Sequence, residues 1–92
     1  MIVRISTEGQ YRMRSEHLDH LNEIDNRIVD AIGREDEAAF AQLLAEMLQF
    51  IRDHGQRLAD VDLEGSDVIL PPPDTTLEEA RHLFEGEGAL PG

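Results

Sequence analysis

Apolar residues in the first 14 positions follow the pattern of a β-hairpin. Tyr11 and Met13 alternate with polar neighbours, and a two-residue period is typical of a strand with one buried face. Glu8-Gly9 is expected to form the turn between the two strands. The β-branched residues of the first strand are Ile2, Val3 and Ile5. The polar positions predicted to face solvent on the second strand are Gln10, Arg12 and Arg14.

From residue 15 the apolar spacing changes to three and four, which predicts an amphipathic helix of about five turns. Ser15 is expected to cap its first turn, and Gly33 is expected to end it in a left-handed conformation. The apolar stripe consists of Leu18, Leu21, Ile24, Ile28 and Ile32.

A second helix is expected to follow almost at once and to end at Gly55. Glu35, Asp36 and Glu37 place negative charge where a helix N-terminus favours it. The broad apolar face is made of Phe40, Leu43, Leu44, Met47, Leu48 and Ile51. Two helices with so short a connection should pack antiparallel, so residues 15–55 are predicted to form a helical hairpin.

The last third of the chain mixes irregular and regular structure. Residues 56–66 are acidic and are expected to be irregular. Residues 68–70 (VIL) are predicted to add an edge strand to the hairpin, because the three prolines that follow cannot continue a central strand. Thr75 with Glu78, and Thr76 with Glu79, have capping-box spacing, which predicts a short third helix. This helix should end at Gly86, before a frayed tail.

These elements predict an α+β fold in a single small domain, residues 1–92, with parts 1–14, 15–55 and 56–92. A chain of this length buries a small core, which favours some self-association, and a homodimer is one expectation. No cysteine is present, so disulfides and thiolate chemistry are excluded.

The charge balance restricts the class of partner. Twenty acidic residues face eight basic ones, all arginine, and the net charge is −12. Such a body repels phosphate backbones and anionic lipid headgroups, which argues against nucleic-acid binding. The apolar start is too short for a signal peptide, and nowhere do 18 apolar residues follow one another, so a cytoplasmic protein without direct membrane insertion is expected.

Catalytic and metal-binding motifs are missing from the sequence. The serines lie outside any Gly-x-Ser-x-Gly elbow, and no glycine-rich phosphate loop precedes a helix, so we expect no enzyme and no cofactor. His17 and His20 lie three apart on the first helix, yet zinc needs further ligands, so the expectation is a solvated helix face without metal. Phe50 falls off the main apolar line and either widens the core or marks a contact surface.

Two stretches are the best candidates for binding another protein. Tyr11, Arg12 and Arg14 are of interface-prone types and lie outside the helical core pattern. The second stretch follows the edge strand and contains Ile69, Leu70, Pro71, Pro72 and Pro73. It is either a stiff spacer that aims the third helix or an apolar strip held extended for a partner.

With these residues in view, the chain resembles the PspA-associated PspAA domain family of bacteria and archaea. The stretches that carry the resemblance are 1–5 (MIVRI), 8–12 (EGQYR), 21–25 (LNEID), 69–74 (ILPPPD) and 76–79 (TLEE). The resemblance implies a small accessory or regulatory partner of PspA, the coiled-coil, membrane-remodelling protein of the phage-shock envelope-stress response. It implies no enzymatic activity and transfers no functional residue.

The sequence therefore supports two functional hypotheses. One is a protein-interaction module that binds a PspA-like coiled coil, with affinity that weakens as salt rises. The alternative is a small dimeric sensor of a metabolite or metal, with His17, His20 or Tyr11 in a pocket between helices.

Overall fold

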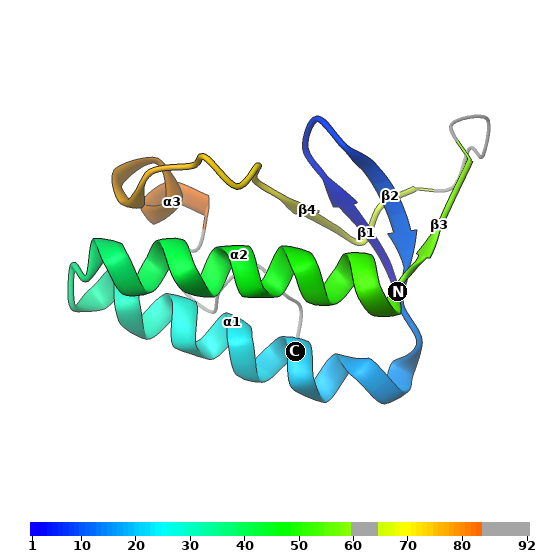
Figure 1. Ribbon diagram of the computed structural model, residues 1–92, viewed down its shortest axis with the longest axis horizontal. Coiled ribbons are helices and arrows are strands. Elements are labelled where there is room, and N and C mark those ends of the chain that lie inside the picture. Colours follow the sequence, from blue (N-terminus) through cyan, green and yellow to red (C-terminus); the bar gives the residue numbers. More distant parts are fainter. Residues whose placement is uncertain (60–64, 84–92) are drawn as a thin grey trace.

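The computed structural model describes residues 1–59 and 65–83 and gives a four-stranded sheet with three α-helices (Figure 1). The elements in chain order are β1 (Ile2–Ile5), β2 (Gly9–Arg12), the 3₁₀-helix η1 (Ser15–His17), α1 (Leu18–Gly33), α2 (Glu37–His54), β3 (Gln56–Arg57), β4 (Val68–Leu70) and α3 (Leu77–Leu83). This arrangement confirms the predicted α+β fold, with its N-terminal hairpin and its short last helix.

The sheet has the order β3-β2-β1-β4, which places both late strands at its edges. β1 and β2 are antiparallel, with Val3 opposite Tyr11, and β4 is parallel to β1, with Val3 opposite Val68. The turn of the hairpin covers residues 6–8, so it starts two positions before the predicted Glu8-Gly9 turn and ends one position before its end. Gly9 opens β2 with φ +144°. The predicted edge strand at 68–70 is therefore confirmed, with β1 as its neighbour.

The helices α1 and α2 run side by side along the molecule, and the sheet lies above them in Figure 1. One face of the sheet packs against the helices and forms an apolar core with them. Apolar residues repeat every two positions in the strands and about every 3.6 positions in the helices, so each element has one apolar face. Sheet residues of this core are Val3, Ile5, Tyr11, Val68 and Leu70, and Met13 joins them directly after β2. Helix residues include Leu21, Ile24, Ile28, Phe40, Leu44, Met47, Leu48 and Ile51.

The ends of the helices differ from the sequence-based expectation in two places. Ser15 does not cap α1: it opens η1, and its carbonyl rather than its hydroxyl accepts a hydrogen bond, from the amide of Leu18. Gly33 is the last residue of α1 and is not left-handed, since the positive φ (56°) falls on Glu35. The amide of Asp36 then bonds to the carbonyl of Ala31, which is the pattern of a Schellman motif with Glu35 in its left-handed position.

Capping was predicted correctly at the start of α3 for one of the two threonines. The amide of Glu79 donates to Thr76 Oγ1 at 3.2 Å, and the amide of Thr76 donates to the Glu79 carboxylate at 3.0 Å. The bond from the Thr76 amide, together with one from the Thr76 hydroxyl to the same carboxylate oxygen at 3.0 Å, holds the pKa of Glu79 below its ordinary value. Thr75 does not pair with Glu78, because its hydroxyl donates to the carbonyl of Pro72 at 2.7 Å. The predicted end of this helix at Gly86 lies outside the described residues.

Residues 56–66 were expected to be irregular, which is wrong for the first two. Gln56 and Arg57 form β3 against β2, and the amide of Leu58 continues the pairing by donating to the carbonyl of Gln10 at 3.0 Å. Gln10 was expected to face solvent but is buried, and its amide nitrogen donates to Ser66 Oγ at 2.7 Å. The pairing with β3 and the contact with Ser66 therefore bury Gln10, which the alternation pattern predicted to face solvent.

Candidate protein-interaction surfaces

The first predicted contact stretch divides between core and surface. Tyr11 is 7% exposed and packs in the core, whereas Arg12 and Arg14 are exposed. These two arginines line a hollow of about 440 Å³ together with His17, Asp53, His54, Gly55 and Gln56. Both arginines therefore lie at the surface, where Arg14 Nη1 is 3.6 Å from a Glu16 carboxylate oxygen, and Tyr11 acts as a core residue.

The second predicted stretch is also divided. Ile69 is 63% exposed and is the exposed large hydrophobic residue of the described part of the chain. Leu70 and Pro71 are buried, Pro72 is half-buried and Pro73 is exposed. Ile69 lines a shallow groove of about 370 Å³ with Ser6, Leu70, Pro71, Pro72, Asp74, Thr75 and Glu79. Leu70 and Pro71 are thus packed into the fold, and Ile69 is the apolar side chain of the stretch that is largely exposed.

The structure brings together four rings that sequence spacing does not connect. Phe50 stacks on His20 with ring centroids 4.5 Å apart, and lies 4.4 Å from the ring of His54. His17 completes the cluster, 4.8 Å from His54 and 5.6 Å from Phe50. These residues line an open groove of about 590 Å³ together with Glu46, Gln49 and Asp53. Phe50 therefore packs against the core and also lines this open groove, and its role as a contact surface stays a prediction.

His54 could not be assigned to this cluster from the sequence, because it lies far along the chain from His17. The signal that was available is the antiparallel helical hairpin itself, which places the start of α1 beside the end of α2. Among the described residues, no three histidine, aspartate or glutamate side chains are grouped in a way that could hold a metal ion.

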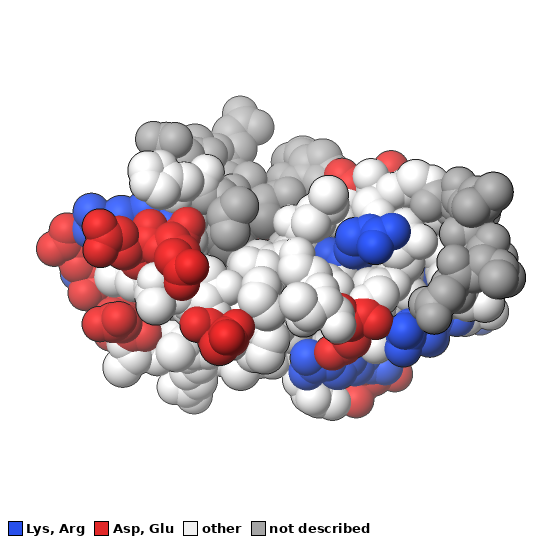
Figure 2. Space-filling model, turned by 90° about the horizontal axis from the view of Figure 1, so that it is seen from above, with Lys and Arg blue, Asp and Glu red and all other residues white. Residues whose placement is uncertain are grey.

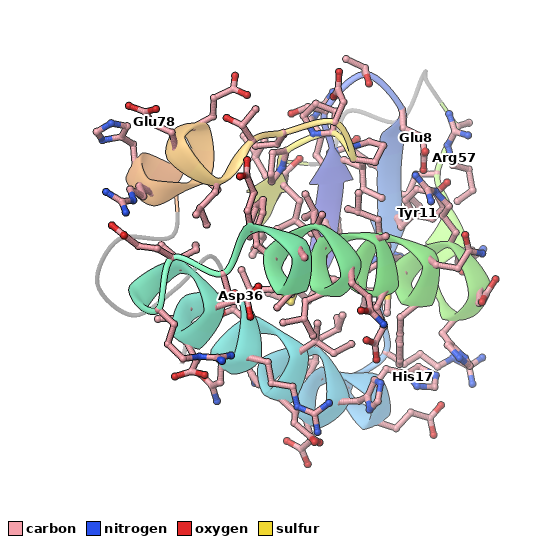
Figure 3. The ribbon with its side chains drawn as sticks, turned by 60° about the vertical axis from the view of Figure 1, so that its left-hand side comes forward. Glu8, Tyr11, His17, Asp36, Arg57 and Glu78 are labelled. Atoms are coloured by element: carbon pink, nitrogen blue, oxygen red, sulfur yellow. The ribbon has the colours of Figure 1, made fainter. Side chains whose placement is uncertain are left out.

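A second polar cluster fastens the hairpin turn to α2. Both carboxylate oxygens of Glu8 accept from Arg52 Nε at 3.0 Å, and Arg52 Nη2 lies 2.8 Å from Oε1. The Tyr11 hydroxyl donates to Glu8 Oε2 at 2.9 Å, and Arg57 Nη2 donates to the Glu8 carbonyl at the same distance. Figure 3 shows Glu8, Tyr11 and Arg57 gathered at this end of the sheet. The Arg52 hydrogen bonds hold the pKa of Glu8 below its ordinary value, and burial raises the pKa of Tyr11.

This cluster predicts a stability loss in acid. A carboxyl whose pKa is lowered by folding stabilises the protein above its unfolded value, about 4.5, and the contribution disappears as pH falls through the folded value. Glu8→Gln is therefore expected to cost about 1 kcal/mol near neutral pH, where the half-exposed pair is partly screened by water. The difference from the unchanged protein should vanish below the folded pKa, in urea denaturation followed over pH.

Glu46→Gln is the matched control, because Glu46 is exposed, lies in the middle of α2 and has no ion pair among the described residues. Its effect on the free energy of unfolding should be small throughout. A Glu8→Gln difference that persists unchanged into acid would mean that the Arg52 contact does not stabilise the fold.

Charge is distributed unevenly over the molecule. In the space-filling view of Figure 2, red carboxylates gather at the end where α3 and the α1–α2 connection lie, and blue arginines are mostly at the hairpin end. Glu35, Glu37 and Glu78 belong to the acidic end, and Arg81 pairs there with Glu35. Within the described residues, no helix has the length and apolarity that crossing a membrane would require.

The fold is a small α+β module with open grooves on its surface. The chain belongs to the PspAA family: the model of this family, described as PspA-associated protein, matches residues 1–92. This match confirms the resemblance that the sequence carries. A search of curated proteins gave no match, and a search of solved structures gave none.

Proposed function

We propose that this chain is a non-enzymatic interaction module that acts in the cytoplasm as an accessory partner of PspA in the envelope-stress response. The observation that carries the proposal is the family match over the whole chain, whose description names association with PspA. A PspA-like coiled coil is a long, charged, helical surface, so this partner would dock by its side chains rather than enter a deep cavity.

Two features of the molecule support a protein partner. Its grooves are open, and their linings mix charged side chains with apolar ones, which is the composition of a non-obligate interface. Its net charge of −12 would speed encounter with a basic stretch of a coiled coil. No described feature favours the metabolite or metal sensor as a second candidate.

The proposal predicts direct, salt-sensitive binding of purified PspA. Affinity measured by isothermal titration calorimetry should fall as salt rises from about 0.1 M to about 1 M, because the Debye length shrinks from about 10 Å to about 3 Å. Failure of the two folded proteins to bind at low salt would contradict the proposal.

Isothermal titration calorimetry of PspA with Ile69→Ser tests the exposed residue of β4, because this substitution leaves its buried neighbours unchanged. Ala41→Ser, on the exposed side of α2, is the matched control. Deleting residues 68–73 would be a poor test, since Val68 and Leu70 are buried and β4 would be lost with them.

A further inference from the structure

The open groove beside His17, His20, Phe50 and His54 is long enough to bind about two turns of one helix. Its α2 wall is formed by residues spaced at i, i+3, i+4, i+7 and i+8, which lie on one face of a helix. At 1.5 Å per residue this wall extends over about 12 Å, or about two helical turns. The residues of the wall are Glu46, Gln49, Phe50, Asp53 and His54, and His17 and His20 lie opposite.

The groove continues beyond α2 into the hollow lined by Arg12 and Arg14. His17, Asp53 and His54 line both spaces, so the two form one continuous surface. Glu46 lies at one end of this surface and the two arginines at the other, where Arg14 also lies 3.6 Å from Glu16, and Asp53 lines the part that the two spaces share. A helix that lies along it therefore meets a carboxylate first and guanidinium groups at least two turns later.

The carboxylate end also holds the Phe50 ring, which stacks on His20 and lies 4.4 Å from the ring of His54. Glu46 and Gln49 lie on the same wall. An arginine or lysine head group is stabilised by a nearby carboxylate, and its alkyl stem can pack against apolar ring atoms. Within the described part of the chain, Glu46 and Asp53 form no salt bridge that would have to be broken first; Asp53 accepts a hydrogen bond only from Gln49, at 2.9 Å.

We infer that this groove docks one helix of the protein partner in a single direction. A basic side chain of that helix lies beside Glu46 and Phe50, and an acidic side chain at least two turns away lies beside Arg12 and Arg14. The inference rests on the proposed function, because it specifies where the partner binds and which charges its helix presents.

A second copy of the chain is the rival occupant, because a surface with opposite charges at its ends is complementary to itself under twofold rotation. Two observations favour a separate helix. Each copy presents a hollow here, and two hollows leave a gap that a convex helix would fill. Each copy also carries a net charge of −12, so two copies repel each other.

The test compares PspA binding by Glu46→Arg, Phe50→Ala and Glu37→Arg in the full chain. Glu46→Arg and Phe50→Ala should each weaken binding by about tenfold, as expected for central contact residues. Glu37→Arg makes the same charge change near the start of α2, outside the groove, and should stay close to the unchanged protein. Because Glu46 is exposed, its variant should fold normally even if Phe50→Ala is destabilised.

The outcomes separate the groove from the proposed function. If PspA binds the unchanged chain and all three variants equally, the groove inference is overturned while the PspA proposal stands. If sedimentation shows a dimer of the unchanged chain that Glu46→Arg dissociates, the occupant is a second copy and the inference is overturned.

If PspA does not bind at all, the proposed function fails and the groove is tested with a small cation. Methylguanidinium chloride, compared by NMR titration with the neutral isostere methylurea, should selectively shift the signals of His20 and Phe50. Glu46→Gln should weaken that shift. Equal shifts with both probes would overturn the inference independently of PspA.

Discussion

Phe40→Ala is expected to lower the free energy of unfolding by about 3–5 kcal/mol, the largest effect of any single change considered for this chain. The ring of Phe40 is 1% exposed and belongs to the core shared by both helices and the sheet. Truncation loses the transfer free energy of the ring and leaves a cavity that a closely packed core cannot fully close. For a domain of this size, whose total stability is roughly 5–14 kcal/mol, such a loss is severe.

Urea denaturation followed by circular dichroism measures this change, and Phe50→Ala provides the matched control. The ring of Phe50 is only half-buried, so its removal should cost about 1 kcal/mol, mainly through lost apolar contact with its histidine neighbours. Equal losses for the two phenylalanines would contradict the division between a core ring and a surface ring.

Gly55→Ala is expected to destabilise the protein by about 1–3 kcal/mol because the site has no room for a methyl group. A Cβ atom on Gly55 would lie 2.6 Å from the Ile51 carbonyl oxygen, 2.8 Å from Met13 Sδ and 3.0 Å from Tyr11 Cβ. The backbone of Gly55 has φ −83°, so the cost is steric and not conformational. Its amide also donates to that carbonyl at 2.7 Å, which fixes the close approach.

Gly33→Ala makes the same chemical change with the opposite expected sign. A Cβ atom on Gly33 meets nothing within 4 Å, and the residue is helical. Alanine should therefore stabilise the protein by about 0.5 kcal/mol by restricting the unfolded chain. A Gly55→Ala protein as stable as the unchanged one, in the same thermal or urea unfolding experiment, would show that β2 and α2 can move apart at this point.

The helical hairpin was predictable because apolar residues recur at helical spacing over several turns of both helices. Leu21, Ile24 and Ile28 on α1, and Leu44, Leu48 and Ile51 on α2, recur at helical spacing and are all buried. The edge strand β4 was predictable for a different reason. Val68 and Ile69 are β-branched, and the prolines that follow Leu70 exclude a central position in the sheet.

The sequence-based predictions are wrong where tertiary packing outweighs a local sequence preference. Left-handed backbone at the end of α1 was assigned to Gly33, yet the geometry of the connection to α2 requires it at Glu35, where a larger residue accepts the strain. β3 was missed because Gln56 and Arg57 are both exposed and carry no alternating pattern. Only the position of β2 beside the end of α2 makes them a strand.

The candidate site was predictable only in part. Arg12 and Arg14 do line a groove, as their exposure and residue type suggested. The alternation along β2 placed Tyr11 on the buried face, whereas its residue type suggested a contact role. The structure buries the ring, and Glu8 accepts a hydrogen bond from its hydroxyl. The ring cluster depends on the pairing of two helix ends, a tertiary fact that spacing along the chain does not contain.

The parallel pairing of β4 with β1 has a consequence during synthesis on the ribosome. The amide of Ile2 donates to a carboxylate oxygen of Asp67, 65 residues later, so the first strand emerges long before its neighbour exists. Local contacts let the two helices collapse early, whereas the closing of the sheet has to wait for nearly all of the chain. A nascent chain stalled before residue 68 would therefore expose one flank of β1, which makes that flank the natural target for a chaperone or for misfolding.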